Sequence, residues 1–66
     1  MFNALKLRQL RKELGLTQIQ LDEAIGLTKK TIANLENGCY QPSLQRAYKI
    51  AKFFNLTIDD FIKEEE

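Results

Sequence analysis

Two consecutive lysines, Lys29 and Lys30, hold the most informative position for chemistry in this chain. They follow Thr28, a residue type that often caps helices, so the sequence predicts that they open a short helix. A helix N-terminus already carries partial positive charge, and two cations there oppose the helix dipole. Such an arrangement suits a helix whose N-terminal end contacts phosphate groups or the edges of guanine bases. The alternative is that both are ordinary solvated lysines.

The sequence contains no group of residues that would support catalysis. The chain has no histidine and a single cysteine, Cys39. No serine or cysteine has a neighbouring base, and no cluster of metal ligands or glycine-rich phosphate loop is present. We therefore expect no enzymatic activity, no metal and no cofactor. Cys39 is best explained as a free loop thiol without a redox role.

Charge is distributed unevenly along the chain. Residues 1–55 carry a net charge of +5 and residues 56–66 a net charge of −4, which together give the overall +1. A basic body is the electrostatic footprint of nucleic-acid binding, provided that the acidic end lies away from the basic face. The alternative is that the acidic tail, residues 63–66, only adds solubility.

Length and hydropathy limit the class of protein. Sixty-six residues predict one domain, spanning residues 1–66, with marginal stability because a short chain buries only ~60% of its surface. No apolar run approaches the ~20 residues of a membrane span, and no signal peptide is visible. The sequence therefore predicts a cytoplasmic, soluble protein that is associated with the nucleoid when it binds DNA.

Capping and stop residues predict five short helices and no strand, and hence a compact all-α fold. Thr17 and Gln20 form the pattern of a capping box at the second helix. Glycines are expected to end the first three helices, and Asn55 the fourth, in left-handed conformations. The expected caps of the third, fourth and fifth helices are Thr28, Ser43 and Thr57.

The pattern L-T-Q-x-x-L-x-x-x-I-G-L-T-x-x-T-I-x-x-L-E-N-G runs from Leu16 to Gly38. Downstream lie P-S-L and A-x-x-I-A-x-x-F-N-L-T-I-D-D-F. Together these motifs resemble the phage repressor/Cro (XRE-type) helix-turn-helix family over residues 5–62. The resemblance implies a five-helix, lambda-repressor-like domain with its helix-turn-helix at the second and third helices. It further implies a small stand-alone Cro-like regulator that acts as a homodimer.

The resemblance also implies which residues touch double-stranded DNA. Lysine can donate to guanine O6 and N7, asparagine can pair with adenine, and threonine can touch a thymine methyl or a phosphate. The alternatives are that Gln18 only serves its helix start and that Tyr40 covers the core edge. The implied base contacts are Lys29, Lys30, Thr31 and Asn34, and the implied backbone contacts are Gln18, Thr28, Asn37, Tyr40 and Gln41.

Two further positions follow from the family pattern. By resemblance, Arg11 and Glu36 form a partly buried ion pair that joins the first helix to the end of the third. Asp22 departs from the pattern, because the family prefers a small residue, usually alanine, at this helix contact. A carboxylate there needs a partner or solvent, and the side chain of Lys29 or Lys30 is the expected partner.

These expectations combine into one functional hypothesis. The chain is predicted to be a sequence-specific transcriptional regulator, a repressor that binds a palindromic operator as a homodimer with its third helix in the major groove. The alternative is a protein-interaction module, an antitoxin or adaptor with the same fold, which binds a partner protein. The expected dimer residues, whose alternative role is to close the monomer core, are Phe2, Leu56, Ile58, Phe61 and Ile62.

Overall fold

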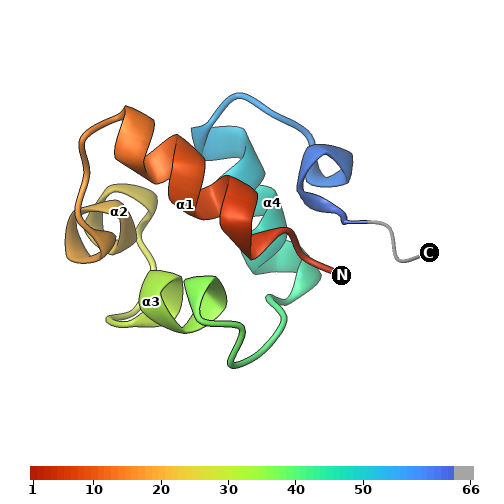
Figure 1. The fold of residues 1–66 in the computed structure, drawn as a ribbon, viewed down its shortest axis with the longest axis horizontal. Helices are drawn as coiled ribbons and strands as arrows, with labels where there is room; N and C mark the ends of the chain where they lie inside the picture. Colours follow the sequence, from red (N-terminus) through yellow and green to blue (C-terminus); the bar gives the residue numbers. More distant parts are fainter. Residues whose placement is uncertain (64–66) are drawn as a thin grey trace.

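Four α-helices make up most of the computed structural model, which describes residues 1–63 (Figure 1). They are α1 (Ala4–Glu13), α2 (Gln18–Ile25), α3 (Thr31–Glu36) and α4 (Leu44–Phe53), and the 3₁₀ turn η1 (Ile58–Phe61) follows. The all-α prediction is confirmed, but the expected fifth helix is only this single 3₁₀ turn. Glu64–Glu66 of the predicted acidic tail lie outside the described residues.

Local capping signals explain where most of these elements begin and end. Thr17 and Gln20 form the predicted capping box, with each side chain accepting from the main-chain N–H of the other residue. Ser43 Oγ accepts from Arg46 N at the start of α4. Gly26 ends α2 with φ +85°, a left-handed conformation that costs glycine little because it lacks a Cβ.

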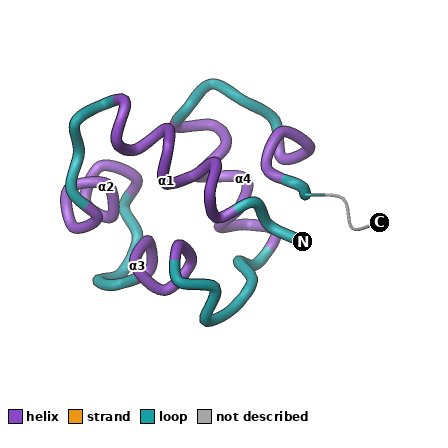
Figure 2. Tube along the Cα trace, in the orientation of Figure 1, coloured by secondary structure: helices purple, strands orange, loops and turns teal. Residues whose placement is uncertain are grey.

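The hydrophobic core draws at least one side chain from every helix. Figure 2 shows α2 and α3 beside one another, with α3 packed against α1 and η1 packed against α4. The buried members are Leu7 of α1, Leu21 of α2, Ile32 and Leu35 of α3, Ile50 and Ala51 of α4, Phe61 of η1, and Phe2. Because α2 and α3 both contribute to one core, the angle between them is set by packing.

Phe2 and Phe61 belong to this core, and the prediction that they form a dimer surface is wrong. Phe2 is 7% exposed and Phe61 is fully buried, with ring centroids 5.5 Å apart in a stacked arrangement. Main-chain hydrogen bonds hold the two ends of the chain together, from Asn3 N to Phe61 O and from Lys63 N to Met1 O. This pairing turns both rings inward. Leu56 and Ile58 are half-buried against the same core, while Ile62 stays exposed.

No helix within residues 1–63 is long and apolar enough to cross a membrane.

Candidate nucleic-acid interface

Between α2 and α3 lies a surface groove of about 650 Å³, here called the α2–α3 groove. Both helices contribute polar side chains, and α3 adds the small Ala33, which leaves room for close approach. Five of the nine residues expected to contact DNA come together here, so these five share one concave surface. The lining residues are Gln18, Ile19, Asp22, Glu23, Lys29, Lys30, Ala33, Asn34 and Asn37.

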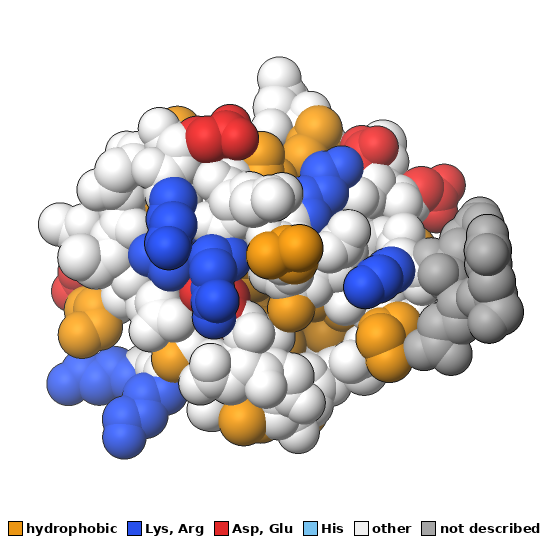
Figure 3. Space-filling view, in the orientation of Figure 1, with side chains coloured by type: hydrophobic (Ala, Val, Ile, Leu, Met, Phe, Trp, Pro, Cys, Tyr) orange, Lys and Arg blue, Asp and Glu red, His pale blue; other side chains and the backbone are white. Residues whose placement is uncertain are grey.

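Lys29 and Lys30 are both exposed, and no carboxylate pairs with either side chain within residues 1–63. On the face seen in Figure 3, Lys and Arg side chains gather over α1 and beside α3, while Asp and Glu lie mainly toward the upper and right-hand edges. Because neither lysine has a carboxylate partner in this part of the chain, both side chains keep their attraction for phosphate. The groove mouth therefore suits an anionic ligand.

The start of α3 differs from the prediction. Thr28 does not cap the helix, which begins three residues later at Thr31 with Lys30 as its N-cap. Lys30 takes a left-handed conformation with φ +68° and makes no side-chain cap of its own. Lys29 and Lys30 thus project from the turn ahead of α3 rather than from its first turn.

Asp22 supplies the missing cap from the neighbouring helix. Its Oδ2 accepts from Lys30 N at 3.1 Å, and its Oδ1 accepts from Ile32 N at 2.9 Å. The expected partner was a lysine side chain, but the observed partners are main-chain N–H groups. A carboxylate is also favourable beside the positive end of a helix dipole. The departure from the family pattern at Asp22 therefore has a structural role.

Thr31 was predicted to reach a base, but it is 2% exposed and cannot do so. Its hydroxyl lies 3.0 Å from the Thr28 hydroxyl, so both side chains are engaged within the protein. The late start of α3 is the physical reason, since it turns position 31 toward the core beside Ile32. Asn34, one turn further along α3, lines the α2–α3 groove and remains half-buried.

The Glu36 carboxylate joins three helices beneath the interface. Its side chain is fully buried, and Arg11 of α1 donates to it twice, from Nε at 2.7 Å and from Nη2 at 3.0 Å. Gln18 of α2 donates from Nε2 at 3.1 Å, and the partly exposed Arg8 donates from Nε at 3.2 Å. The side chain expected to reach DNA at the head of α2 is therefore oriented by α3.

Burial raises the pKa of the Glu36 carboxyl, but hydrogen bonds from Arg11, Gln18 and Arg8 outweigh that effect and hold the pKa below its ordinary value. The same contact, mainly through the hydrogen bond to Glu36, raises the pKa of Arg11. Both groups are thus charged at neutral pH. The pair fixes the position of α3 relative to α1 as a charged, hydrogen-bonded unit.

The loop after α3 is divided between two surfaces. Asn37 lines the α2–α3 groove, and Tyr40 is partly exposed. Gln41, expected at a phosphate, is exposed, and its side-chain Oε1 accepts from Phe2 N at 2.7 Å. This bond ties the loop to the N-terminal segment and uses only the oxygen of the amide, so the Nε2 group that would donate to a phosphate is not involved in it. Cys39 is an exposed free cysteine.

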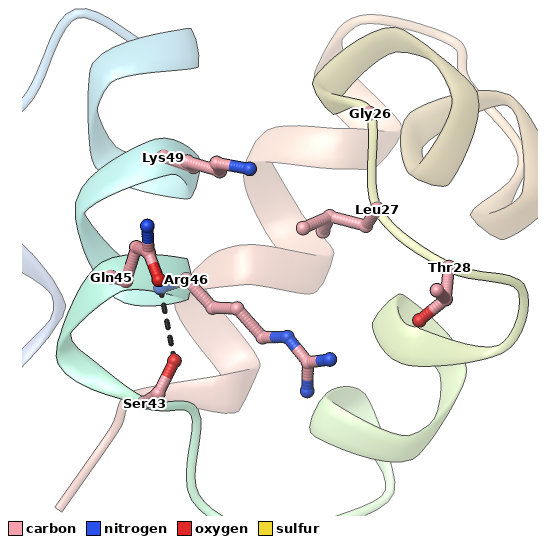
Figure 4. A pocket seen from close by; sticks show the side chains of 7 residues that line it. All are labelled: Gly26, Leu27, Thr28, Ser43, Gln45, Arg46 and Lys49. Carbon is pink, nitrogen blue, oxygen red and sulfur yellow. Dashed lines mark hydrogen bonds between the residues drawn. The ribbon is translucent and has the colours of Figure 1, made fainter.

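A second cavity, of about 470 Å³, separates α4 from the segment that joins α2 to α3. Figure 4 shows Arg46 reaching from α4 toward this segment, with Lys49 one turn further along the same helix. None of the lining residues is acidic, and Thr28, which precedes the two groove lysines, borders it too. The lining residues are Gly26, Leu27, Thr28, Ser43, Gln45, Arg46 and Lys49.

Sequence reasoning missed two features of this surface. Arg46 and Lys49 are three residues apart on a helix without a single acidic residue, and this spacing was a usable signal. The cap made by Asp22 had no such signal. It joins residues eight and ten positions apart on different helices, and only the packing of α2 against α3 brings them together.

Comparisons with known proteins match the sequence of this chain to a described domain family. A family model described as helix-turn-helix matches residues 7–61. The chain is 45% identical over 62 residues to an uncharacterized HTH-type transcriptional regulator of Archaeoglobus fulgidus, covering 92% of this chain and 89% of that protein.

Two similar proteins have more specific names. One is the HTH-type transcriptional activator BcrR of Enterococcus faecalis, 39% identical over 61 residues, which are 92% of this chain and 30% of BcrR. The other is the cryptic phage CTXphi transcriptional repressor RstR of Vibrio cholerae, 35% identical over 61 residues, which are 92% of this chain and 55% of RstR.

Proposed function

The chain belongs to the helix-turn-helix family and is a transcriptional regulator with a DNA-binding domain of that type, and from this premise we propose a specific mode of action. It binds a palindromic operator as a homodimer, inserts α3 into the major groove and represses transcription. Members of this family are regulators rather than enzymes. The property to be explained is therefore the recognition of DNA.

The observation that carries the proposal is the composition of the α2–α3 groove. Lys29 and Lys30 stand exposed at one end of α3, and Asn34 follows one turn later. Lysine donors match guanine O6 and N7, and the asparagine amide can pair with adenine N6 and N7. A rigid α2–α3 angle is what allows one helix to enter a major groove while the other crosses the backbone.

Backbone contacts complete the proposed interface. Gln18 and Asn37 border the groove, and Tyr40 lies in the following loop. Contacts of this kind position a protein on the duplex without reading its sequence. Arg46 and Lys49 of α4 add cations beside the segment that joins α2 to α3. A duplex groove is bordered by phosphates on both sides, so cations beyond the α2–α3 groove suit it.

The size of the domain and its apolar surface both support the proposed homodimer. Operators of this kind present half-sites about 34 Å apart, and the chain measures 33 × 24 × 21 Å, so two copies side by side match that spacing. Apolar residues border a shallow groove of about 260 Å³ at the chain ends. This terminal apolar face, through which the two copies meet, consists of Met1, Pro42, Leu44, Ile58 and Ile62.

Repression would result from occupying the operator and excluding polymerase. The Vibrio relative is named a repressor and the Enterococcus relative an activator. A reporter assay therefore decides between repression and activation for this chain. Reporter expression from the cognate promoter should rise when the chain is removed. A fall in expression would assign activation and leave the DNA-binding part of the proposal intact.

The decisive experiment is a selection from a random duplex pool at roughly physiological salt. An enriched palindrome with half-sites about 10 base pairs apart is the expected result. Weak, salt-sensitive binding without enrichment would contradict the proposal. The terminal apolar face would then favour the alternative, in which the domain binds a partner protein as an adaptor or antitoxin.

A further inference from the structure

Asp22 occupies an unusual position for an acidic residue. It lies in the α2–α3 groove beside Lys29 and Lys30, yet it is only 3% exposed. Both carboxylate oxygens accept main-chain hydrogen bonds from the start of α3, from Lys30 N and from Ile32 N. Its main-chain carbonyl also accepts from Gly26 N and Leu27 N, so one residue holds the end of α2, the turn and the start of α3.

Lys30 depends on this support. A left-handed conformation is unfavourable for a residue with a Cβ and persists only where surrounding contacts hold it. The hydrogen bond from Lys30 N to Asp22 is such a contact, and no side chain of the 28–31 segment replaces it as a cap. Without the carboxylate, Lys30 N and the buried Ile32 N lose their acceptors.

We propose that Asp22 is a positioning residue for DNA recognition. Its carboxylate holds the turn at residues 29–30 so that both lysine side chains face the base edges in the DNA major groove. The inference rests on the proposed DNA-reading function. Asp22 itself touches no DNA in this proposal, because its oxygens are buried and already occupied. It acts through the main chain of Lys30 and through the start of α3.

Simple electrostatics makes the opposite prediction, which allows a clean test. A carboxylate beside DNA-facing lysines repels phosphate, so its removal should tighten DNA binding if charge alone mattered. Positioning predicts weaker binding. Glu23 is the matched control, because it is adjacent on α2, lines the same groove and carries the same charge, but it is exposed and makes no described hydrogen bond through its side chain.

The experiment compares Asp22→Asn with Glu23→Gln, two changes that each remove one negative charge and keep the side-chain shape. Affinity is measured by fluorescence anisotropy on the selected duplex at fixed salt. Asp22→Asn retains an acceptor for one N–H group and loses the other. Since a hydrogen bond to a charged acceptor is among the stronger ones and its loss frees the 29–30 turn, we expect roughly tenfold weaker binding. Glu23→Gln should bind equally or more tightly.

A second comparison separates positioning from general stability. In a Lys29→Ala/Lys30→Ala background the Asp22→Asn change should weaken binding much less, because both lysines that it positions are gone. An equal loss in both backgrounds would assign Asp22 to stability alone and overturn the proposal. Thermal melting followed by circular dichroism confirms that each variant is folded at the assay temperature.

The outcomes also separate this inference from the function on which it rests. If the wild-type chain binds its duplex and Asp22→Asn binds equally or more tightly, only the positioning role fails. If the wild-type chain selects no duplex at all, the proposed function fails and the positioning role fails with it.

Discussion

Lys29 and Lys30 differ in how the backbone presents them. Lys30 is held in a left-handed conformation at the helix cap, whereas Lys29 belongs to the turn before it. Neither side chain has a carboxylate partner among residues 1–63, so each keeps its full charge for a ligand. A lysine that reads a base and a lysine that grips a phosphate leave different signatures when they are removed.

Replacing Lys29 or Lys30 by alanine should weaken binding to the selected duplex by about 1–3 kcal/mol if that lysine reads a guanine. Binding to duplexes altered at the contacted base should change little, so specificity relaxes at one position. The measurement is a competition series over single-base variants of the operator. Uniform loss across all duplexes would instead assign the lysine to the phosphate backbone.

Among the elements, α3 is the shortest helix and the one most dependent on its neighbours. It spans only Thr31–Glu36, and a helix of this length is not stable alone in water. Asp22 of α2 holds its first turn, and Arg11 of α1 holds its last residue through Glu36. The proposed recognition helix is thus fixed at both ends by charged groups from other helices.

The ion pair between Arg11 and Glu36 makes the free energy of unfolding depend on pH. Because the pKa of Glu36 is lower in the folded chain than its ordinary value of 4.5, its contribution is complete above about pH 4.5 and is lost as pH falls through the folded pKa. Urea unfolding should show Glu36→Gln less stable than wild type by about 3–5 kcal/mol at pH 7, since Arg11 is left buried without its partner. The difference should shrink at pH 3.

A double-mutant cycle checks the origin of this effect. The Arg11→Met/Glu36→Gln double variant should lose less free energy of unfolding than the two single variants lose in sum, because no unpaired charge remains buried. Additive losses would show that the two residues act separately, and would contradict the pair as the link between α1 and α3.

At the scale of the whole molecule, the cationic surface and the terminal apolar face are formed by different residues. Four cations without a carboxylate partner among residues 1–63, Lys29, Lys30, Arg46 and Lys49, border the α2–α3 groove and the cavity beside α4, while the terminal apolar face lies where the chain ends meet. Asp59 and Asp60 belong to η1, at the chain-end side of the molecule. A dimer formed through the terminal apolar face would leave the cationic surface of each copy free for a duplex.

Disrupting the terminal apolar face should separate the copies without unfolding them. Leu44 is 73% exposed and Ile62 47%, so Leu44→Asp or Ile62→Asp places a charge on the surface rather than in the core. Sedimentation should then report a monomer at concentrations where wild type is dimeric, with weaker binding to the palindrome. Leu14→Asp, an equally polar change at the exposed end of α1, serves as the control. A monomeric wild type at tens of micromolar would exclude a preformed dimer.

Salt dependence tests whether the α4 cations reach the backbone. If Arg46 and Lys49 each contact a phosphate, alanine at either position should lower the slope of log affinity against log salt by about 1. The sequence preference of the protein should stay unchanged, because these contacts read no base. Lys52→Ala, one turn further along α4 and beside the Tyr48 ring, should leave the slope as it is. Equal slopes for all three variants would place this surface away from DNA.

The sequence by itself determined the features that depend on neighbours in the chain. The capping box at Thr17, the cap at Ser43 and the left-handed Gly26 each involve interactions within a few residues, so local pattern predicts them. The spacing of apolar residues across α2 and α3 predicted the helix pair in the same way, and the motif from Leu16 to Gly38 resembled the family. The assigned DNA contacts remain predictions.

Only the tertiary structure decided how those pieces meet. The late start of α3, the burial of Thr31 and the cap from Asp22 all follow from the packing of α2 on α3, which no local signal encodes. Likewise, Phe2 and Phe61 are buried because the two chain ends pair across the whole sequence. Contacts between distant residues depend on which surfaces come together, and that choice is made by the core as a whole.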